Sequence, residues 1–303
     1  QMRLRSVVFI LTMTVGAAVY DPDLMSRVMA VLGSDRVLSQ GQTLRFPVYL
    51  TFVLALFTLA AVLGMDEVRP DSGERGSGMK PPGGSATEAF RRTLETGGWI
   101  LRTPFVLAVI LFGMLFDGIL RMVITLASQY YRMVSLPEST YGILGSVMAM
   151  AGLFIPRLAR RIAETHSAVY CLWTTAAVAL SGLAGMAFFW PYAGLVPALV
   201  AFSALYMVGF YLSYFVNRHT SSSRRATVLS FKGLAYNLSY GLIGMIYAGA
   251  LEARKAALDG AAVDTRSMEN FVFKETFLWF PVALAAGLAA MAAGMAVYRA
   301  RRR

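Results

Sequence analysis

The stretch PFVLAVILFGMLFDGILRMVITL, residues 104–126, decides the fold class of this chain. It is apolar over a length that suits a lipid bilayer, because an α-helix rises about 1.5 Å per residue and the hydrocarbon core is about 30 Å thick. Seven further apolar blocks repeat this pattern, so we predict an all-α polytopic membrane protein with eight spans. The predicted spans are Val7–Leu32, Leu44–Met65, Pro104–Leu126, Tyr141–Ile155, Ala168–Trp190, Ala193–Val216, Thr227–Leu251 and Thr276–Tyr298.

The composition supports this class and argues against an enzyme. Hydrophobic residues make up 57% of the 303 residues and charged residues only 15%, which is more apolar than a soluble domain can bury. The lone cysteine, Cys171, excludes an internal disulfide. The sequence holds no His, Cys or carboxylate cluster with metal-ligand spacing, no GxSxG motif and no phosphate-binding loop. We therefore expect no catalytic activity, no metal and no cofactor.

The net charge of +11 raises the question of a nucleic-acid partner, which the distribution of the basic residues answers. With the N-terminus inside the cell, 18 of the 28 lysine and arginine residues fall in cytoplasmic segments. This asymmetry follows the positive-inside rule and predicts that both termini are cytoplasmic. The excess charge thus orients the chain in a lipid bilayer, and we expect no nucleic-acid binding.

A long polar segment separates the first two predicted spans from the last six. The chain accordingly divides into residues 1–65 with two spans, 66–103 as a cytoplasmic loop, and 104–303 with six spans. Within the loop, Ser85 with Glu88 three residues later is typical of a helix N-terminus, and Phe90 and Leu94 follow at helical spacing. This pattern predicts a short amphipathic helix on the cytoplasmic membrane surface. On the external side, residues 252–275 form the only sizeable predicted loop.

The first two spans look like a second copy of the last two. LRFPVYL at 44–50 matches LWFPVAL at 278–284, with Pro47 aligned to Pro281. A second alignment pairs Arg5, Val8 and Tyr20 with Arg225, Val228 and Tyr240. Proline is common in the first turn of any helix, so chance is the competing interpretation of the first match. The repeat also argues against a cleaved signal peptide, because the counterpart of the first span is an internal helix.

A basic motif carries a family resemblance. GLFIPRLARR at 152–161 follows the predicted end of the fourth span and resembles the cytoplasmic loop signature of the major facilitator superfamily of secondary transporters. The residues that match this loop motif are Gly152, Arg157, Arg160 and Arg161. Pro156 replaces the acidic residue of the signature and Ala159 its second glycine, so an ordinary positive-inside loop is the alternative. Residues 223–244 are similar to the eleventh span of the family.

The resemblance covers the whole chain as spans five to twelve of a twelve-span plan. It implies a helical bundle of the major facilitator superfamily (MFS) type, of which this sequence lacks the four N-terminal spans. It also implies a monomeric protein of the bacterial inner membrane that moves a small-molecule or ion substrate by alternating access.

Two charged residues inside the third predicted span suggest a substrate or proton pathway. Asp117 and Arg121 lie about 20 Å and 26 Å from Pro104 along a helix, and their i, i+4 spacing puts them on one face. Charges at such depth usually face a polar cavity, although a structural pair that locks two helices is the alternative. Tyr236 and Tyr240 form a stripe with Lys232 on the seventh span and are candidates to line the same pathway, with interior packing as the alternative. Gly233, Asn237, Gly241, Gly244 and Ala248 form a face suited to close packing.

A second polar island, DPD at 21–23, interrupts the first span. Pro22 removes a helix hydrogen bond, so either the span is broken there and Asp21 contributes to the pathway, or the helix ends. The sequence as a whole predicts secondary active transport, and coupling to protons through these carboxylates is a further hypothesis. The alternative is a receptor or assembly scaffold that uses the same fold without transporting.

Overall fold

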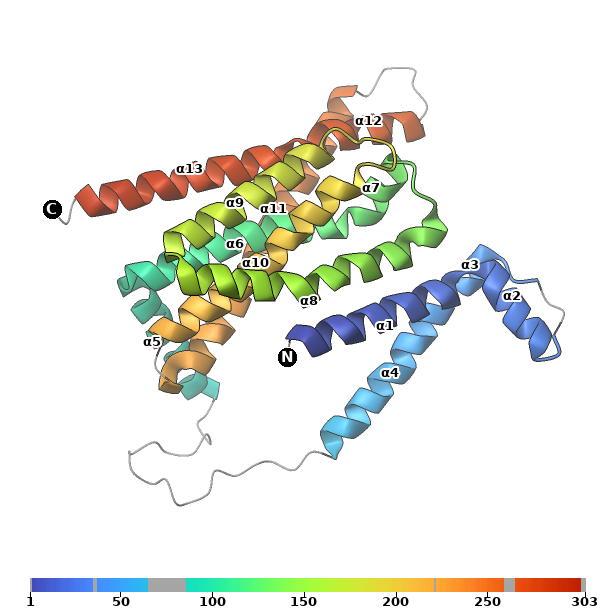
Figure 1. The fold of residues 1–303 in the computed structure, drawn as a ribbon, viewed down its shortest axis with the longest axis horizontal. Coiled ribbons are helices and arrows are strands. Elements are labelled where there is room, and N and C mark those ends of the chain that lie inside the picture. Colours follow the sequence, from blue (N-terminus) through green and yellow to red (C-terminus); the bar gives the residue numbers. More distant parts are fainter. Residues whose placement is uncertain (1, 35–36, 65–85, 221, 259–264, 301–303) are drawn as a thin grey trace.

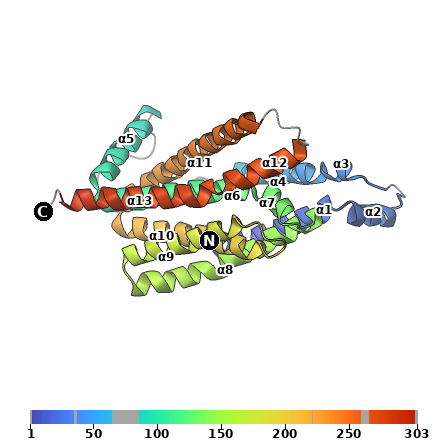
Figure 2. The same ribbon diagram turned by 90° about the horizontal axis from the view of Figure 1, so that it is seen from above.

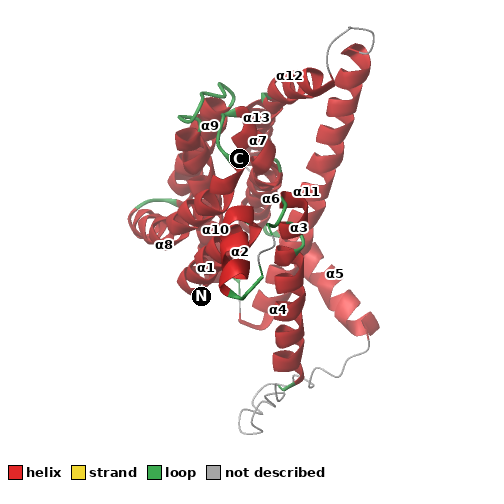
Figure 3. Cartoon of the chain, turned by 90° about the vertical axis from the view of Figure 1, so that its right-hand side faces the viewer, coloured by secondary structure: helices red, strands yellow, loops and turns green. Residues whose placement is uncertain are grey.

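The computed structural model describes residues 2–34, 37–64, 86–220, 222–258 and 265–300, and all of its regular elements are helices (Figures 1 and 3). The α-helices, with one 3-10 turn η2, are α1 (Met2–Tyr20), α2 (Pro22–Val31), α3 (Gln40–Thr43), α4 (Phe46–Leu63), α5 (Ala86–Arg102), α6 (Pro104–Thr125), α7 (Ala127–Met133), η2 (Glu138–Thr140), α8 (Tyr141–Thr165), α9 (Ala168–Met186), α10 (Leu195–His219), α11 (Ser222–Leu258), α12 (Thr265–Phe277) and α13 (Trp279–Ala300). The predicted all-α class is confirmed.

The lengths and exposed surfaces of these helices are those of a membrane protein. Seven stretches of the described residues are long and apolar enough to cross a bilayer, and the bent pair α1–α2 would make an eighth. Helix α4 has no buried residue, and its Phe57 and Leu63 are 70% and 77% exposed. Large exposed apolar surfaces of this kind are stable in lipid rather than in water.

Helix α6 lies at the centre of the larger bundle. It packs against α10 on one side and against α11 and α13 on the other, and α8 and α9 lie beyond α10 (Figure 2). Ten of its residues are buried, among them Phe116, Leu120 and Val123. The charged side chains of α6 are therefore held on a helix whose position is set by apolar packing on several sides.

Helix α1 lies against α8 over much of its length, which joins residues 1–64 to the larger bundle (Figure 1). A side-chain carbon at Gly142 would clash with the Ala17 Cβ and would lie 3.0 Å from the Met13 carbonyl oxygen. Thr14 Oγ1 and Ser146 Oγ also share a hydrogen bond of 3.0 Å. Because glycine has no side chain, the two helix backbones approach closely at this seam.

The first predicted span is broken at Asp21. Helices α1 and α2 meet there at an angle of 78°, and the Asp21 carboxylate accepts hydrogen bonds from the backbone N–H groups of Asp23 at 2.9 Å and Leu24 at 3.2 Å. Asp21 is thus the N-cap of α2, followed by Pro22 at the first helical position, where a missing N–H costs nothing.

Several predicted boundaries were wrong because helices continue beyond the apolar blocks. Helix α8 runs to Thr165, so the motif residues Gly152, Arg157, Arg160 and Arg161 lie in a helix and not in a loop. Its last turns are held by buried Ala159 and Ala163 and by an Arg160–Glu164 ion pair of 2.7 Å, which compensate for the interior Pro156. Similarly, α11 and α12 occupy most of the predicted external loop at 252–275.

The predicted amphipathic helix before α6 is present as α5, although Ser85 lies outside the described residues. Its Gly97 and Ile100 are buried, and a side-chain carbon at Gly97 would lie 3.2 Å from the Phe231 ring of α11. Phe90 and Leu94 are exposed. One end of α5 therefore packs on the bundle while its apolar residues at the other end face outward.

The helix starts of the proposed repeat agree, but the bodies of the paired helices differ. Pro47 is the second residue of α4 and Pro281 the third of α13. By contrast, α1 ends at Tyr20, whereas α11 continues for 18 residues past Tyr240. The reason is local, since Asp21 and Pro22 end α1 while Gly241 and Leu242 leave the backbone hydrogen bonds of α11 intact.

Candidate functional site

The predicted charged residues lie where α6 and α11 pack closely. A side-chain carbon at Gly118 of α6 would lie 2.6 Å from the Ile243 side chain and 2.8 Å from Ser239 Oγ. Ser239 donates a hydrogen bond of 2.8 Å to the carbonyl oxygen of Met114, across the same contact. Two glycines of α6, Gly113 and Gly118, therefore let α11 approach closely enough for side-chain hydrogen bonds between the helices.

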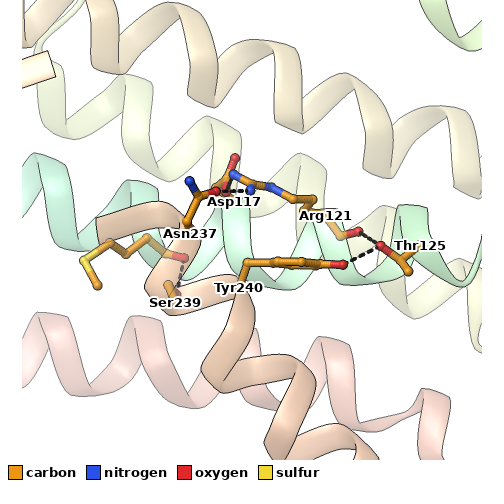
Figure 4. A network of polar contacts seen from close by, with 7 residues as sticks. Asp117, Arg121, Thr125, Asn237, Ser239 and Tyr240 are labelled. Carbon is orange, nitrogen blue, oxygen red and sulfur yellow. Dashed lines mark hydrogen bonds and ion pairs between the residues drawn. The ribbon is translucent and has the colours of Figure 1, made fainter. Parts of the chain in front are cut away.

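Asp117 and Arg121 form an ion pair that continues onto α11 (Figure 4). Arg121 Nη2 donates to Asp117 Oδ2, and Arg121 Nη1 donates to Asn237 Oδ1 at 2.8 Å. The Asp117 side chain is 15% exposed and the Arg121 side chain 33% exposed. The i, i+4 pairing predicted from the sequence is confirmed, and Asn237 extends it between two helices.

Tyr240 completes the network on the other side of Arg121. The Arg121 guanidinium carbon lies 5.2 Å from the centre of the Tyr240 ring, a cation–π distance. The Tyr240 hydroxyl shares a hydrogen bond of 3.0 Å with Thr125 Oγ1, which also donates to the Arg121 carbonyl oxygen (Figure 4). Asp117, Arg121 and Tyr240 are therefore brought together at the contact between α6 and α11.

Tyr236 lies near this network but has a different environment. Its side chain is buried, and its hydroxyl has no hydrogen-bond partner among the described residues. The Lys232 ammonium lies 5.5 Å from the centre of the Tyr236 ring. A side-chain carbon at Gly113 would clash with the Tyr236 hydroxyl, so Tyr236 fills the space that this glycine leaves.

The predicted small-residue face of α11 contacts α6 only in part, since Asn237 bonds to Arg121 and a side-chain carbon at Gly244 would lie 3.9 Å from Met122 Sδ. Side-chain carbons built at Gly233 and Gly241 would meet nothing within 4 Å, and Asn237 and Ala248 are exposed. The larger residues of α11 pack on the glycines of α6 instead. The expected face is therefore not where the two helices approach most closely, because small residues on either partner allow close packing, and here α6 supplies them.

A cavity of about 720 Å³ lies apart from this network, between α1, the α6–α7 region, α8 and α10. None of Asp117, Arg121, Tyr236 and Tyr240 lines it. Tyr20, next to the broken span, does line it, whereas Asp21 does not and serves as a helix cap. Sequence reasoning missed the cavity and its tyrosines, Tyr131 and Tyr141, since neither stands out within its own segment.

Comparison with family models, curated proteins and solved structures returned no match of any of the three kinds. The function proposed below therefore rests on the residues of this chain and on their geometry.

Proposed function

We propose that the protein is a secondary active transporter of the major facilitator type, which moves a small solute by alternating access and couples this movement to protons. The single observation that carries the proposal is the Asp117–Arg121 pair inside an apolar span. Inserting charged side chains at such a depth costs a few kcal/mol each, even after partial compensation by pairing. A chain that needed only helix packing would be served by apolar residues, which often stabilise a protein as well as or better than a buried ion pair.

The network offers a physical basis for proton coupling. Arg121 is shared between Asp117 on its own helix and Asn237 and Tyr240 on α11. Protonation of Asp117 would remove the negative partner of Arg121 and leave its charge to the Asn237 amide oxygen and the Tyr240 ring. The relative stability of two α6–α11 arrangements would then depend on the proton, which is what coupling requires.

The alternative is a receptor or assembly scaffold on the same fold, and one observation favours it. Asp117, Arg121 and Asn237 satisfy one another in a helix–helix contact and do not line the large cavity. A purely structural network of this kind would stabilise the bundle without moving a solute.

The cellular setting is part of the proposal. The excess of basic residues on one side supports cytoplasmic termini and a location in a bacterial plasma membrane. We propose a monomer, which is what the resemblance to the family implies.

Asp117→Asn in the full-length protein tests the proposal. The variant keeps the size of the side chain and removes its charge, so it should insert and fold. The measurement is solid-supported-membrane electrophysiology of proteoliposomes under a pH gradient, with a panel of neutral, cationic and anionic solutes. We expect the wild type to give solute-induced currents and Asp117→Asn to abolish them. Glu164→Gln is the matched control, because Glu164 forms the same i, i+4 pair with an arginine on an exposed surface.

A receptor or scaffold predicts no currents even in the wild type, whereas a purely structural role of the ion pair in a protein that does transport predicts a different pattern. Breaking a buried ion pair typically costs about 3–5 kcal/mol, and less where the pair is partly exposed as here. Asp117→Asn would then lower the thermal stability, and the double variant with Arg121→Gln would recover both stability and currents. That recovery, or normal currents in the single variant, would refute a role for Asp117 in coupling.

A further inference from the structure

We propose that the cavity between α1 and α8 is the substrate site and that it takes an uncharged, largely apolar solute carrying hydrogen-bonding groups at one end. The assignment of the bound molecule as a substrate rests on the transport function proposed above. The binding site itself follows from the size, walls and charge of the cavity.

The size of the cavity suits a drug-sized molecule. Its volume of about 720 Å³ falls within the range of roughly 300–1,000 Å³ that is typical of small-molecule sites. It is far larger than the gaps between well-packed helices, which seldom exceed a water molecule.

Most of the wall is apolar, and most of its large apolar side chains come from three helices. Phe9 and Met13 belong to α1, Met148 to α8, and Phe202 and Leu205 to α10. Aromatic and methionine side chains adapt to apolar ligands of varied shape. The walls therefore favour a hydrophobic body over a hydrated ion or sugar.

The polar groups lie on residues that connect α6 to α8. Tyr131 is 6% exposed and lines the cavity, and no described residue shares a hydrogen bond with its hydroxyl. The Tyr141 hydroxyl is buried and forms no hydrogen bond with a described residue, although Arg132 lies near it, and the Tyr141 ring centre lies 5.3 Å from that of Tyr131. A buried hydroxyl without a partner is unfavourable, so Tyr141 in the cavity wall points to a ligand that supplies the missing hydrogen bond, and the Tyr131 hydroxyl beside it offers a second one.

The charges around the cavity balance. Among the described residues that line the cavity, Arg132 and Glu138 are the ionic ones, and they pair at 3.9 Å. A charged ligand would lose its hydration on entering the cavity, and the wall offers no unpaired opposite charge to offset that loss. The site therefore favours a neutral solute.

The position of the cavity links such a ligand to movement. In the sequence, α1 precedes the central loop and α7, α8 and α10 follow it, and all four helices contribute to the cavity walls. A bound solute would contact both parts beside the close seam at Gly142, and binding could favour one relative position of α1 over another.

Two glycine variants test the location of binding. Gly16 lines the cavity, and a side-chain carbon there meets nothing within 4 Å, so Gly16→Trp should fold and fill part of the volume. Gly249 on α11 has the same open surroundings and lies outside the cavity, so Gly249→Trp is the matched control. The probe is tritiated progesterone, a rigid neutral molecule with carbonyl acceptors, measured on the full chain in nanodiscs against empty nanodiscs. We expect saturable binding that Gly16→Trp weakens roughly tenfold or more and Gly249→Trp leaves unchanged.

Two adjacent tyrosines test the hydrogen-bonding end. Tyr131→Phe removes a hydroxyl that shares no hydrogen bond with a described residue, so it should weaken progesterone binding about fivefold without lowering thermal stability. Tyr130 is also buried but donates to the Gly194 carbonyl oxygen at 2.9 Å and does not line the cavity. Tyr130→Phe should therefore lower stability and leave binding unchanged.

Further ligands separate the possible occupants. Tetraphenylphosphonium and tetraphenylborate carry opposite charges on similar apolar bodies, and neither should compete with progesterone. Saturable binding of either ion at this site, or no saturable progesterone binding, would overturn the proposal. A membrane lipid is the other possible occupant, and mass spectrometry of the purified protein tests for it. A lipid that the wild type retains, that Gly16→Trp loses and that progesterone does not displace would also overturn the proposal of a solute site. Because binding is measured at equilibrium, its failure is distinct from a failure of the Asp117 transport experiment.

Discussion

Replacing Gly113 and Tyr236 tests the close contact between α6 and α11, because we expect the two substitutions to change the stability of the protein in opposite directions. An alanine side chain at Gly113 would lie 2.6 Å from the Tyr236 ring carbon Cζ, and nearer still to the Tyr236 hydroxyl and the Leu212 methyl group. Ordinary van der Waals contacts begin near 3.4 Å, so the helices or both side chains must shift. Overpacking of this kind typically costs about 1–3 kcal/mol, and we expect Gly113→Ala to destabilise the protein by that amount.

Tyr236→Phe should act in the opposite direction. The variant removes a buried hydroxyl that has no partner among the described residues, and the desolvation penalty of such a group is about 1–3 kcal/mol. We therefore expect a gain of about 1 kcal/mol. In the double variant the clash with the hydroxyl disappears while the contacts with Cζ and Leu212 remain, so Tyr236→Phe should rescue part of the Gly113→Ala loss.

The measurement is thermal unfolding of the four proteins in one detergent, where about 1 kcal/mol corresponds to roughly 2–4 °C for a domain of 150–250 residues. Gly241→Ala on α11 is the control, because its new methyl group meets nothing within 4 Å and alanine favours a helix. A neutral Gly113→Ala would show that α11 does not approach α6 as described. A loss of stability in Tyr236→Phe would show that the hydroxyl has a partner.

Two further predictions concern the seam and the topology. Gly142→Val should loosen the α1–α8 seam and lower the melting temperature, while Ala17→Gly in the same chain should restore part of it; an unchanged melting temperature in Gly142→Val would refute the close contact. In a Cys171→Ala background, single cysteines at Ser72, Ser222 and Asp259 should react with an impermeant reagent from outside only at 259; external labelling at 72 in intact cells would refute cytoplasmic termini. Ser72 and Asp259 lie outside the described residues.

The sequence alone determined the membrane class, the approximate spans and the ion pair. Apolar blocks of about 20 residues leave few alternatives to transmembrane helices, because the backbone must satisfy its own hydrogen bonds in lipid. Asp117 and Arg121 could be paired from their spacing, since residues four apart lie on one face of any α-helix. These features depend on local geometry, which a sequence encodes directly.

Helix ends were less predictable, because hydropathy marks where a chain leaves the lipid and not where a helix stops. Helix α8 continues ten residues past the expected end at Ile155, held by buried alanines and an exposed ion pair. The sequence left open whether the first span is broken at Asp21, which would then contribute to the pathway, or whether the helix simply ends there. The structure shows a cap and a sharp bend, which depend on where the Asp21 carboxylate points.

Only the tertiary structure decided which helix faces meet. Asn237 joins Arg121, and Gly113 lies under Tyr236, although more than a hundred residues separate the partners in each case. The cavity likewise combines Met13, Tyr131, Met148 and Phe202, whose sequence contexts are those of ordinary core residues. Hydrophobic burial is not directional, so many pairings of apolar helices satisfy the same sequence pattern, and the complementary shapes of side chains and glycines select one of them.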